Sequence, residues 1–425
     1  MAGSPAGIRR EGGKGFLKVG LDYQRSPPEG EQEEGKTPSH EKPRQEGAKP
    51  KSNLRGRYPG PIPLNPFTCI LPCMTVRMKD IARDLNLSIV TISKALRNHP
   101  DIADDTRERV LRRVKELDYQ PNIMARSLVT GRSFLIGLVV PDLIHPFFAE
   151  IAKVLSAVMG KRGYSVIVSS SEEDAQLEYR EIKHLTARRL DGLVIASAGN
   201  DIEPFERMDR MGMPYVLIDR DLRGLDANYV GIDDETAGRM ATEHLIDQGC
   251  KVIAHIRGRE TSTGNQRCMG YKNALKRRGM KYTESLVVDQ QSTQVEASPL
   301  GAEAMRLLLK HTPVPDGVFA YNDALAIGAM DAILEAGLRI PEDIAVIGCG
   351  NLHYNASLRV PLSSIDQNSS LIGQRTAAIL LAMIESKSRL ESVTVILEPS
   401  LMVRASTMRN APSLNGTGKA KAKKA

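Results

Sequence analysis

The chain has 425 residues, of which 41% are apolar and 26% charged, with a formal net charge of +7. This length predicts about three domains, and the positive charge is compatible with a polyanionic partner. No apolar run is long enough to span a membrane and no segment reads as a signal peptide, so we expect a cytoplasmic protein with no membrane partner. The five cysteines are scattered and odd in number, which predicts neither a disulfide framework nor a metal site.

Residues 1–73 are rich in Gly, Pro, Ser and charged side chains and poor in apolar ones. Such a composition buries too little surface to offset the entropy of the chain, so we expect a disordered extension. Residues 30–37 satisfy the phosphate-loop pattern G-x4-G-K-T, but their interior is acidic, no strand precedes them and Pro38 follows at once. We interpret this match as coincidence, because a working loop lies between a strand and a helix.

Residues 78–98 carry the pattern of two short amphipathic helices joined by a tight turn. The apolar faces of the two helices are Ile81, Ala82 and Leu85, then Ile92, Ala95 and Leu96. Ser88 stands where a helix N-cap belongs. The other face of the second helix carries Ile89, Val90, Ser93, Lys94 and Arg97. This pattern predicts a helix-turn-helix whose second helix lies in the DNA major groove; the alternative is an ordinary αα-corner of a globular core.

A third helix is predicted to open at Asp104 and Asp105, because acidic side chains complement the helix dipole there. Its apolar stripe is Val110, Val114 and Leu117, and its solvated or phosphate-facing side is marked by Arg107, Arg109, Arg112 and Arg113. Residues 119–128 follow, with Asn122 as the expected cap of one more short helix.

Residues 76–128 resemble the DNA-binding headpiece and hinge of the LacI/GalR (lactose-repressor) family of bacterial transcription regulators. The matching signature is D-I-A-x3-N-L-S-x2-T-I-S-K-A-L, then T-R-E-R-V, then Y-Q-P-N-x3-A-R-S-L. Motifs at this spacing are specific and weigh against the αα-corner. The resemblance implies a headpiece over residues 74–121 and a hinge helix with its linker over residues 122–133. Members of the family usually begin about where Met74 stands, so we hypothesise that translation starts there rather than at Met1.

At the DNA site, hydroxyl donors for phosphate or base come from Ser88, Thr91 and Ser93, and positive charge comes from Lys94 and Arg97. The resemblance places Ile89 and Val90 at the two base-reading positions, where apolar side chains would contact groups such as the thymine methyl. Alternatively, one of them packs back into the headpiece. The resemblance also implies that Leu128 wedges into the minor groove and kinks the duplex, with Asn122 and Arg126 in the same DNA-binding segment. A plain packing role is the alternative for Leu128.

From residue 134 onward, short apolar and β-branched runs alternate with helical patterns. The predicted strands are residues 134–140, 165–169, 192–196, 215–218, 252–256, 286–288, 317–320 and 344–347. The predicted helices are residues 147–162, 176–189, 235–248, 265–278, 296–310, 322–336 and 371–385. Continuous apolar strands between helices indicate parallel sheets covered on both faces, and their number indicates two doubly wound lobes of an α/β core. No G-x-G-x-x-G follows a strand, which argues against a dinucleotide enzyme, and no cofactor is expected.

This region, residues 134–409, resembles the effector-binding and dimerisation core of the same family, which is similar to periplasmic sugar-binding proteins. The family's markers stand here as Pro141-Asp142, His145-Pro-Phe-Phe148, Ile218-Asp-Arg220, Arg267-Cys-Met-Gly-Tyr271, Tyr321-Asn-Asp323 and Val346-Ile-Gly348. Family topology implies that the chain crosses between the lobes three times and that the helix at 371–385 returns to the first lobe. Ligands of such sheets bind at the carboxyl ends of the strands, here between the lobes.

The resemblance implies an effector site in which Arg267 binds hydroxyls or carboxylates, as a guanidinium fork can. Other candidates follow strand ends or offer an apolar wall: Asp219, Asn322 and Asp323, then Phe147 and Phe148. Alternatively, Asp323 is a helix cap, and at least one of the two phenylalanines belongs to the core.

The chain departs from the family after residue 348, where most members carry an aromatic residue and an aspartate that binds ligand hydroxyls. The residues here are Cys349-Gly350-Asn351. Either Asn351 substitutes as a neutral partner, or the ligand is anionic, because the loss of a carboxylate removes repulsion. A regulator that needs no ligand is a third possibility.

Together these features predict a transcription regulator, a repressor rather than an enzyme, that binds a palindromic operator in double-stranded DNA as a homodimer. A small-molecule effector, such as a sugar or a related metabolite, would control it. The alternative is a periplasmic-type solute-binding protein, which would need an export signal and no headpiece. Residues 410–425 form a basic Lys/Ala tail that we expect to be disordered. The effector, the operator, the sign of regulation and dimer versus tetramer stay open.

Overall fold

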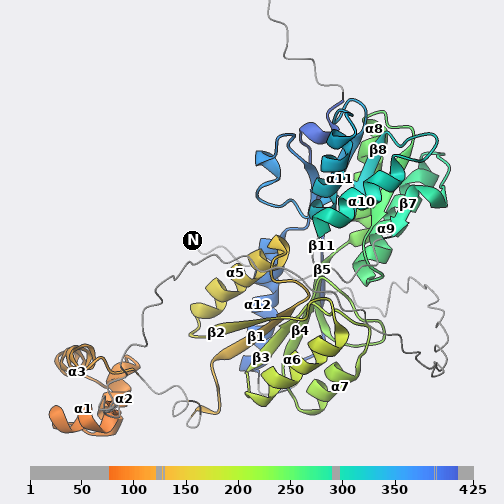
Figure 1. Ribbon diagram of the computed structural model, residues 1–425. Helices are drawn as coiled ribbons and strands as arrows, with labels where there is room; N and C mark the ends of the chain where they lie inside the picture. Colours follow the sequence, from red (N-terminus) through yellow and green to blue (C-terminus); the bar gives the residue numbers. More distant parts are fainter. Residues whose placement is uncertain are drawn as a thin grey trace, which may run out of the picture. The chain divides into compact units, whose positions relative to one another are not determined.

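The computed structural model describes residues 76–120, 127, 130–289, 297–386, 388 and 390–409. Three helices come first: α1 (Met78–Asp84), α2 (Ile89–Leu96) and α3 (Asp104–Glu116). Two α/β lobes follow in the chain, each built on a six-stranded sheet (Figure 1). The expected terminal extensions lie outside the described residues. Within them, no helix is both long and apolar enough to cross a membrane.

The three-helix headpiece, α1 to α3, closes over a small apolar core. Ile81, Ile92 and Val110, one from each helix, are fully buried, and Ala82, Ala95 and Tyr119 complete the core. The Ser88 hydroxyl accepts a hydrogen bond from the Thr91 N–H at 3.0 Å, so the predicted N-cap of α2 is confirmed. Asn86 lies in the left-handed region with a φ of 53°, which an Asn tolerates and which turns the chain between α1 and α2.

The prediction that four arginines of α3 share a solvated side is wrong for Arg107, and the partly exposed Arg113 is bonded within the headpiece. Arg107 folds back and donates to the carbonyls of His99 and Ile102, at 3.2 and 2.8 Å. Arg113 donates its Nε–H to Asp84 at 3.0 Å and so ties α3 to the end of α1. Helical periodicity alone cannot show this, because the acceptor residues all lie outside α3. Arg109 and Arg112 are exposed.

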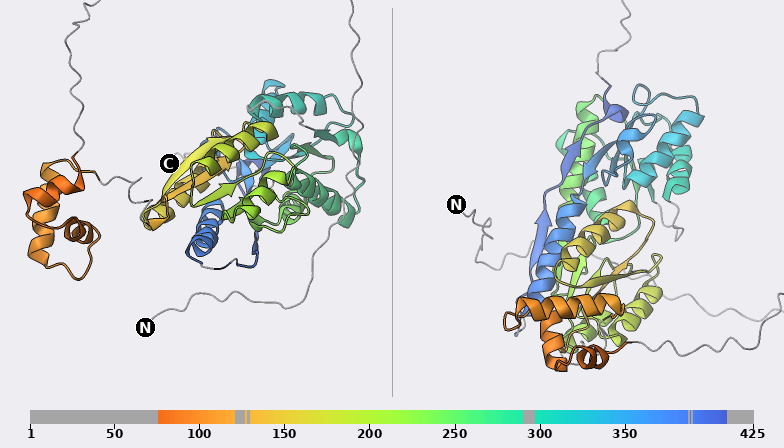
Figure 2. Two further views of the ribbon diagram at one scale, coloured as in Figure 1. Left: turned by 90° about the horizontal axis from the view of Figure 1, so that it is seen from below. Right: turned by 90° about the vertical axis from the view of Figure 1, so that its left-hand side faces the viewer.

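Lobe 1 is a parallel sheet in the order β11-β5-β4-β3-β1-β2. Its strands are β1 (Leu135–Val140), β2 (Ser165–Ser170), β3 (Gly192–Ile195), β4 (Tyr215–Ile218), β5 (Asn228–Ile232) and β11 (Thr394–Leu397). One face packs on α5 (Pro146–Gly160) and α12 (Ser369–Glu385), which lie side by side in Figures 1 and 2. The other face packs on α6 (Ala175–Ala187) and α7 (Glu203–Arg210). The predicted doubly wound lobe is confirmed.

Lobe 2 has the strand order β12-β10-β9-β8-β6-β7. Its strands are β6 (Ile253–Arg257), β7 (Val287–Asp289), β8 (Gly317–Ala320), β9 (Ala345–Cys349), β10 (Ser363–Asp366) and β12 (Ser400–Met402). Its helices are α8 (Asp234–Asp247) and α9 (Ser262–Arg277) on one face, with α10 (Ala297–Leu308) and α11 (Asp323–Glu335) on the other. Among the described strands of this lobe, only β12 runs antiparallel, against β10. Three short 3-10 turns are Glu284–Leu286, Asn355–Ser357 and Ala405–Thr407.

The chain crosses between the lobes three times: from β5 to α8, from β10 to α12, and from β11 to β12. Both the predicted number of crossings and the return of the helix at 371–385 to lobe 1 are confirmed. The sequence patterns did not predict β5, α7, β10, β11 and β12. Of these, β11 and β12 lie at sheet edges and alternate exposed with half-buried residues, so they lack the continuous apolar run of a central strand.

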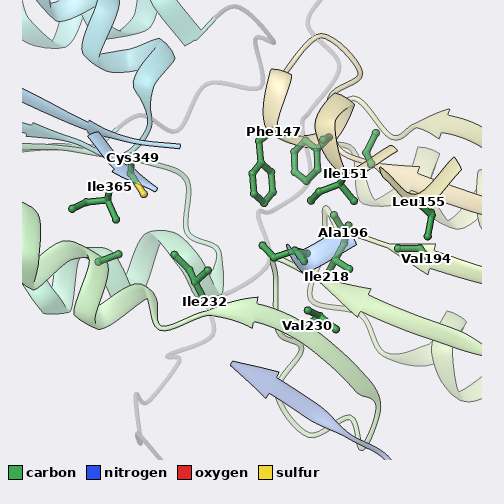
Figure 3. Close-up of a cluster of buried hydrophobic side chains, with 14 of the residues drawn as sticks. Phe147, Ile151, Leu155, Val194, Ala196, Ile218, Val230, Ile232, Cys349 and Ile365 are labelled. Carbon is green, nitrogen blue, oxygen red and sulfur yellow. The ribbon is translucent and has the colours of Figure 1, made fainter. Parts of the chain in front are cut away.

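One buried apolar cluster runs along the α5 face of lobe 1 and continues into lobe 2. Figure 3 shows Phe147 and Ile151 of α5 near Ile218 of the sheet, and the same cluster includes Cys349 and Ile365 of lobe 2. Because these side chains belong to one contiguous core, the crossing segments rest on packed apolar surface.

Two helices of lobe 2, α8 and α9, approach so closely that only glycine fits at their contact. A Cβ on Gly238 would lie 2.1 Å from the carbonyl oxygen of Arg267, and a Cβ on Gly270 would lie 2.1 Å from that of Glu235. These glycines therefore set the position of the α9 backbone at Arg267.

We predict that Gly238→Ala destabilises the protein by about 3 kcal/mol, because an added methyl group forces two backbones apart. Gly160→Ala is the matched control: no atom lies within 4 Å of its added Cβ, so the change should be neutral or stabilise by up to about 1 kcal/mol. Urea unfolding of both variants measures the difference, and equal stabilities would contradict the close-packing argument.

Candidate functional site

The outward face of α2 begins with two exposed apolar side chains. Ile89 is 51% exposed and Val90 62% exposed, in the first turn of a helix that Ser88 caps. The alternative in which one of them packs back into the headpiece is therefore wrong. The Ser88 and Thr91 hydroxyls lie 2.8 Å apart, so the capping pair is held together at the start of the helix.

Polar and cationic groups continue along the same helix. The Lys94 ammonium lies 3.0 Å from a carboxylate oxygen of Asp101, and the Arg97 Nε–H donates to the Ser93 carbonyl at 3.2 Å. Apolar side chains at the first turn followed by cations match a helix that contacts base edges with its N-terminal end and phosphates with its sides. The remaining predicted DNA residues, Asn122, Arg126 and Leu128, lie outside the described residues.

A second group of functional candidates stands at the carboxyl ends of the strands in both lobes. Asp219 follows β4 directly, with a φ of 63°, and is nine-tenths buried. Its carboxylate accepts no hydrogen bond from any residue that the structure describes, and its nearest cationic atom is Arg220 Nε at 3.8 Å. Burial raises the pKa of Asp219, and the charges of Arg220 and Arg267 oppose that shift. A buried acceptor without a donor is suited to a ligand hydroxyl.

Arg267 is only 2% exposed, and other protein groups occupy its guanidinium. Its Nε–H donates to Asp234 at 2.7 Å, and its two terminal nitrogens donate to the Tyr321 carbonyl and to Gln367, at 2.8 and 3.0 Å. The guanidinium also stacks 4.7 Å from the centre of the Tyr321 ring. Arg267 therefore connects three segments of the chain by hydrogen bonds, and the Asp234 carboxylate neutralises its charge.

Glu173 joins two arginines from different lobes. Its carboxylate accepts two hydrogen bonds from Arg220 of lobe 1, at 2.6 and 2.8 Å, and its backbone carbonyl accepts one from Arg259 of lobe 2 at 3.2 Å. Burial raises the pKa of Glu173, but the hydrogen bonds and charge of Arg220 outweigh that effect and hold the pKa below its ordinary value. Beside it, the Ser262 hydroxyl of lobe 2 accepts from the Asp221 N–H of lobe 1 at 2.9 Å.

Three other predicted effector residues are bonded within the fold. Asn322 caps α11 by accepting from the Leu325 N–H at 2.9 Å, and its amide nitrogen lies 3.5 Å from the ring of His145 across the lobes. The Asp323 carboxylate is fully buried and accepts hydrogen bonds from groups that follow β9 and lie in β10, namely Leu352, Asn355 and Ser364. Asn351 accepts from Arg404 at 2.6 Å and donates to Asp366 at 3.1 Å. Asp323 and Asn351 therefore hold loops in place.

Both phenylalanines, Phe147 and Phe148, are buried and pack edge-to-face with centroids 5.0 Å apart. The expectation that at least one belongs to the core is met by both, so neither serves as an exposed apolar wall. Among the described residues, no group of three or more His, Cys, Asp or Glu side chains could hold a metal ion.

Sequence reasoning missed the partners of these residues: His145, Glu173, Arg259, Asp234 and Gln367. A signal was present for some of them, because Glu173 and Arg259 follow β2 and β6 in the positions where ligand-binding loops begin. Asp234 and Gln367 also follow strands, β5 and β10, but the sequence patterns did not predict these strands, so the same signal was missing.

Two family descriptions match this chain. Residues 77–122 match "Bacterial regulatory proteins, lacI family", and residues 133–402 match "Periplasmic binding proteins and sugar binding domain of LacI family". The transcriptional regulator CelR of Thermobifida fusca is 33% identical over 324 residues, which cover 74% of this chain and 94% of CelR. The match over residues 77–122 disfavours the solute-binding alternative and the enzyme alternative.

Solved structures of transcription regulators are also similar to this chain. A complex of the regulator CelR with cellobiose is 30% identical, with a TM-score of 0.59 over 78% of this chain and 99% of that chain. A lac repressor dimer bound to operator and the anti-inducer ONPF is 26% identical, with a TM-score of 0.68 over 78% of this chain and 99% of that chain.

We predict that Glu173→Gln destabilises the protein by about 3 kcal/mol, because it removes the only carboxylate that accepts hydrogen bonds from the buried Arg220 guanidinium among the described residues. Arg259→Gln breaks the contact of Glu173 with the other lobe but removes only a partly exposed cation, so its cost should be about 1 kcal/mol or less. Equilibrium urea unfolding compares the two, and a larger loss for Arg259→Gln would contradict this ranking.

Proposed function

Because this chain belongs to the LacI family of bacterial regulatory proteins and is a DNA-binding transcription regulator, we propose that it is a homodimeric repressor of a palindromic operator, controlled by a small molecule bound between its lobes. Such a regulator acts where the chromosome lies, so we place it in the cytoplasm. Within the chain we assign residues 74–121 to the headpiece, 122–133 to a hinge, and 134–409 to the effector-binding and dimerisation core. Residues 1–73 and 410–425 are the extensions.

The observation that carries the DNA-binding role is the exposed pair Ile89 and Val90 on a capped helix. Covering a large apolar side chain that is exposed to water is favourable, and the thymine methyl is an apolar partner for such side chains in the major groove. Two headpieces of a dimer would meet two half-sites about one helical turn apart. At the centre of the operator, Leu128 is our candidate for the kinking residue, with Asn122 and Arg126 beside it.

Selection of bound duplexes from a random pool with the full chain should enrich a palindrome, and the half-site should include thymine. We predict that Ile89→Ala or Val90→Ala weakens binding to that sequence by about tenfold, because each loses one apolar base contact. Leu111→Ala is the matched control, since Leu111 is an equally exposed apolar residue of α3. Unselective enrichment, or an equal loss in the control, would contradict base reading by α2.

We infer that the effector is a neutral, hydroxyl-rich molecule rather than an anion. The candidate cations Arg267 and Arg220 are each neutralised by a carboxylate, from Asp234 and Glu173. Asp219, by contrast, offers acceptor oxygens that no described residue occupies. A site whose cations are neutralised and whose carboxylate has open acceptor positions favours hydrogen-bond donors, and carbohydrates supply them. The CelR relative in complex with cellobiose is consistent with this class of ligand.

We predict that Asp219→Asn lowers the affinity for the bound carbohydrate at least tenfold and leaves operator affinity unchanged, because only the ligand's donors meet this side chain. Asp201→Asn is the control, since Asp201 on lobe 1 accepts a hydrogen bond from the Glu203 N–H at 3.0 Å and an Asn side chain accepts it too. Calorimetry against a panel of mono- and disaccharides, including ribose and cellobiose, measures the change. Tight binding of an anionic metabolite instead would contradict the inference.

A further inference from the structure

The helix α2 carries one cation, Lys94, that forms an ion pair with an acidic residue of the headpiece, Asp101. The Lys94 ammonium is 3.0 Å from Asp101, with the two side chains 34% and 58% exposed. Arg97, one turn further along, donates instead to the backbone carbonyl of Ser93 and keeps its full charge. The two cations of the same helix face therefore differ in how much positive charge they present to DNA.

The position of Asp101 is set by the loop between α2 and α3. The Asp101 N–H donates to the His99 ring at 3.3 Å, and the Ile102 N–H donates to the His99 carbonyl at 3.2 Å. Arg107 donates to the carbonyls of His99 and Ile102, so the guanidinium ties the loop to α3. The hydrogen bond and charge of Lys94 hold the pKa of Asp101 below its ordinary value, so the carboxylate stays ionised at neutral pH.

The Asp101 carboxylate reduces the net positive charge that Lys94 presents to DNA. Attraction to arbitrary phosphates depends on free positive charge, and an ion-paired lysine releases fewer counterions. An ammonium has three donors, however, so Lys94 can keep Asp101 and still donate to a base acceptor in the major groove.

We propose that Asp101 is a specificity-determining residue: by holding Lys94 it weakens binding to DNA of arbitrary sequence while it leaves a donor for the operator. This inference rests on the proposed DNA-reading role of α2. It adds a repulsive element to recognition, since specificity grows when affinity for the wrong partner falls.

The test is Asp101→Asn in the full chain, with affinities for a random-sequence duplex and for the selected operator measured from 50 to 200 mM salt. Freeing one lysine per headpiece should steepen the slope of log affinity against log salt concentration by about 0.9 per headpiece on the random duplex. Between 200 and 50 mM salt, the affinity of the variant should therefore rise about threefold more per headpiece than that of the parent protein. Operator affinity should change less than twofold, so the ratio of operator to random affinity falls. An unchanged ratio overturns the proposal.

Two further variants separate the causes. Asp118→Asn removes an exposed carboxylate from the end of α3, at a backbone φ of 46° that Asn tolerates, and controls for net charge. In a Lys94→Gln background, Asp101→Asn should no longer raise random-duplex affinity. A rise that persists there, or an equal rise from Asp118→Asn, would mean that the lost carboxylate acts directly on phosphate and would overturn the proposal. If Lys94→Gln alone leaves all DNA binding unchanged, both the DNA-contact role of Lys94 and the role of Asp101 are refuted. If Lys94→Gln weakens DNA binding but Asp101→Asn has no effect, only the role of Asp101 is refuted.

Discussion

The buried ion pair between Arg267 and Asp234 holds together the segments that connect the two lobes. Asp234 opens α8, directly after the first crossing of the chain, and Gln367 lies in the second crossing, between β10 and α12. A single guanidinium donates to both, and to the carbonyl of Tyr321 at the end of β8. Removing one partner of such a buried pair typically costs about 3–5 kcal/mol, because a charge is left without compensation. The close contact at Gly238 fixes the α9 backbone at Arg267, so the helix packing of lobe 2 and the geometry of the crossings depend on each other.

This constraint limits how an effector can act. A ligand shifts an equilibrium only by its difference in affinity for two states, so it must meet groups whose surroundings differ when the lobes move. Arg267 is a poor candidate for that role, because its partners Asp234 and Gln367 move with its own lobe or with the crossings. Glu173 is better placed, since it is bonded to lobe 1 through Arg220 and to lobe 2 through Arg259. A rotation of the lobes would change a contact of this kind, which joins residues of both lobes.

Features that depend on residues close together in the sequence could be predicted, and contacts between residues far apart in the sequence could not. Local signals succeeded: the Ser88 cap, the apolar faces of α1 and α2, and central strands such as β4 depend on neighbours within a few residues. The edge strands β11 and β12 were missed because their half-exposed runs resemble loops, whereas the edge strands β2 and β7 were predicted. At the sites, positions were predicted but not partners, since Arg107 and Arg267 bond to groups that the fold alone brings near. The position of Asp219 at a strand end is a local feature and could be predicted, whereas its ligand-binding role stays a prediction.

The departure of this chain from the family pattern after residue 348 has a structural counterpart. Where family members usually place an aspartate that binds ligand hydroxyls, Asn351 bonds to Asp366 at the end of β10 and to Arg404 beyond β12. An aspartate at residue 351 would face the Asp366 carboxylate at hydrogen-bond distance and be repelled, whereas an amide donates to Asp366 and accepts from Arg404 at once. The neutral residue therefore joins two segments of lobe 2 that the chain reaches on separate passes. On our proposal, ligand selectivity then depends on the opposite lobe, where the Asp219 carboxylate accepts no hydrogen bond from any described residue.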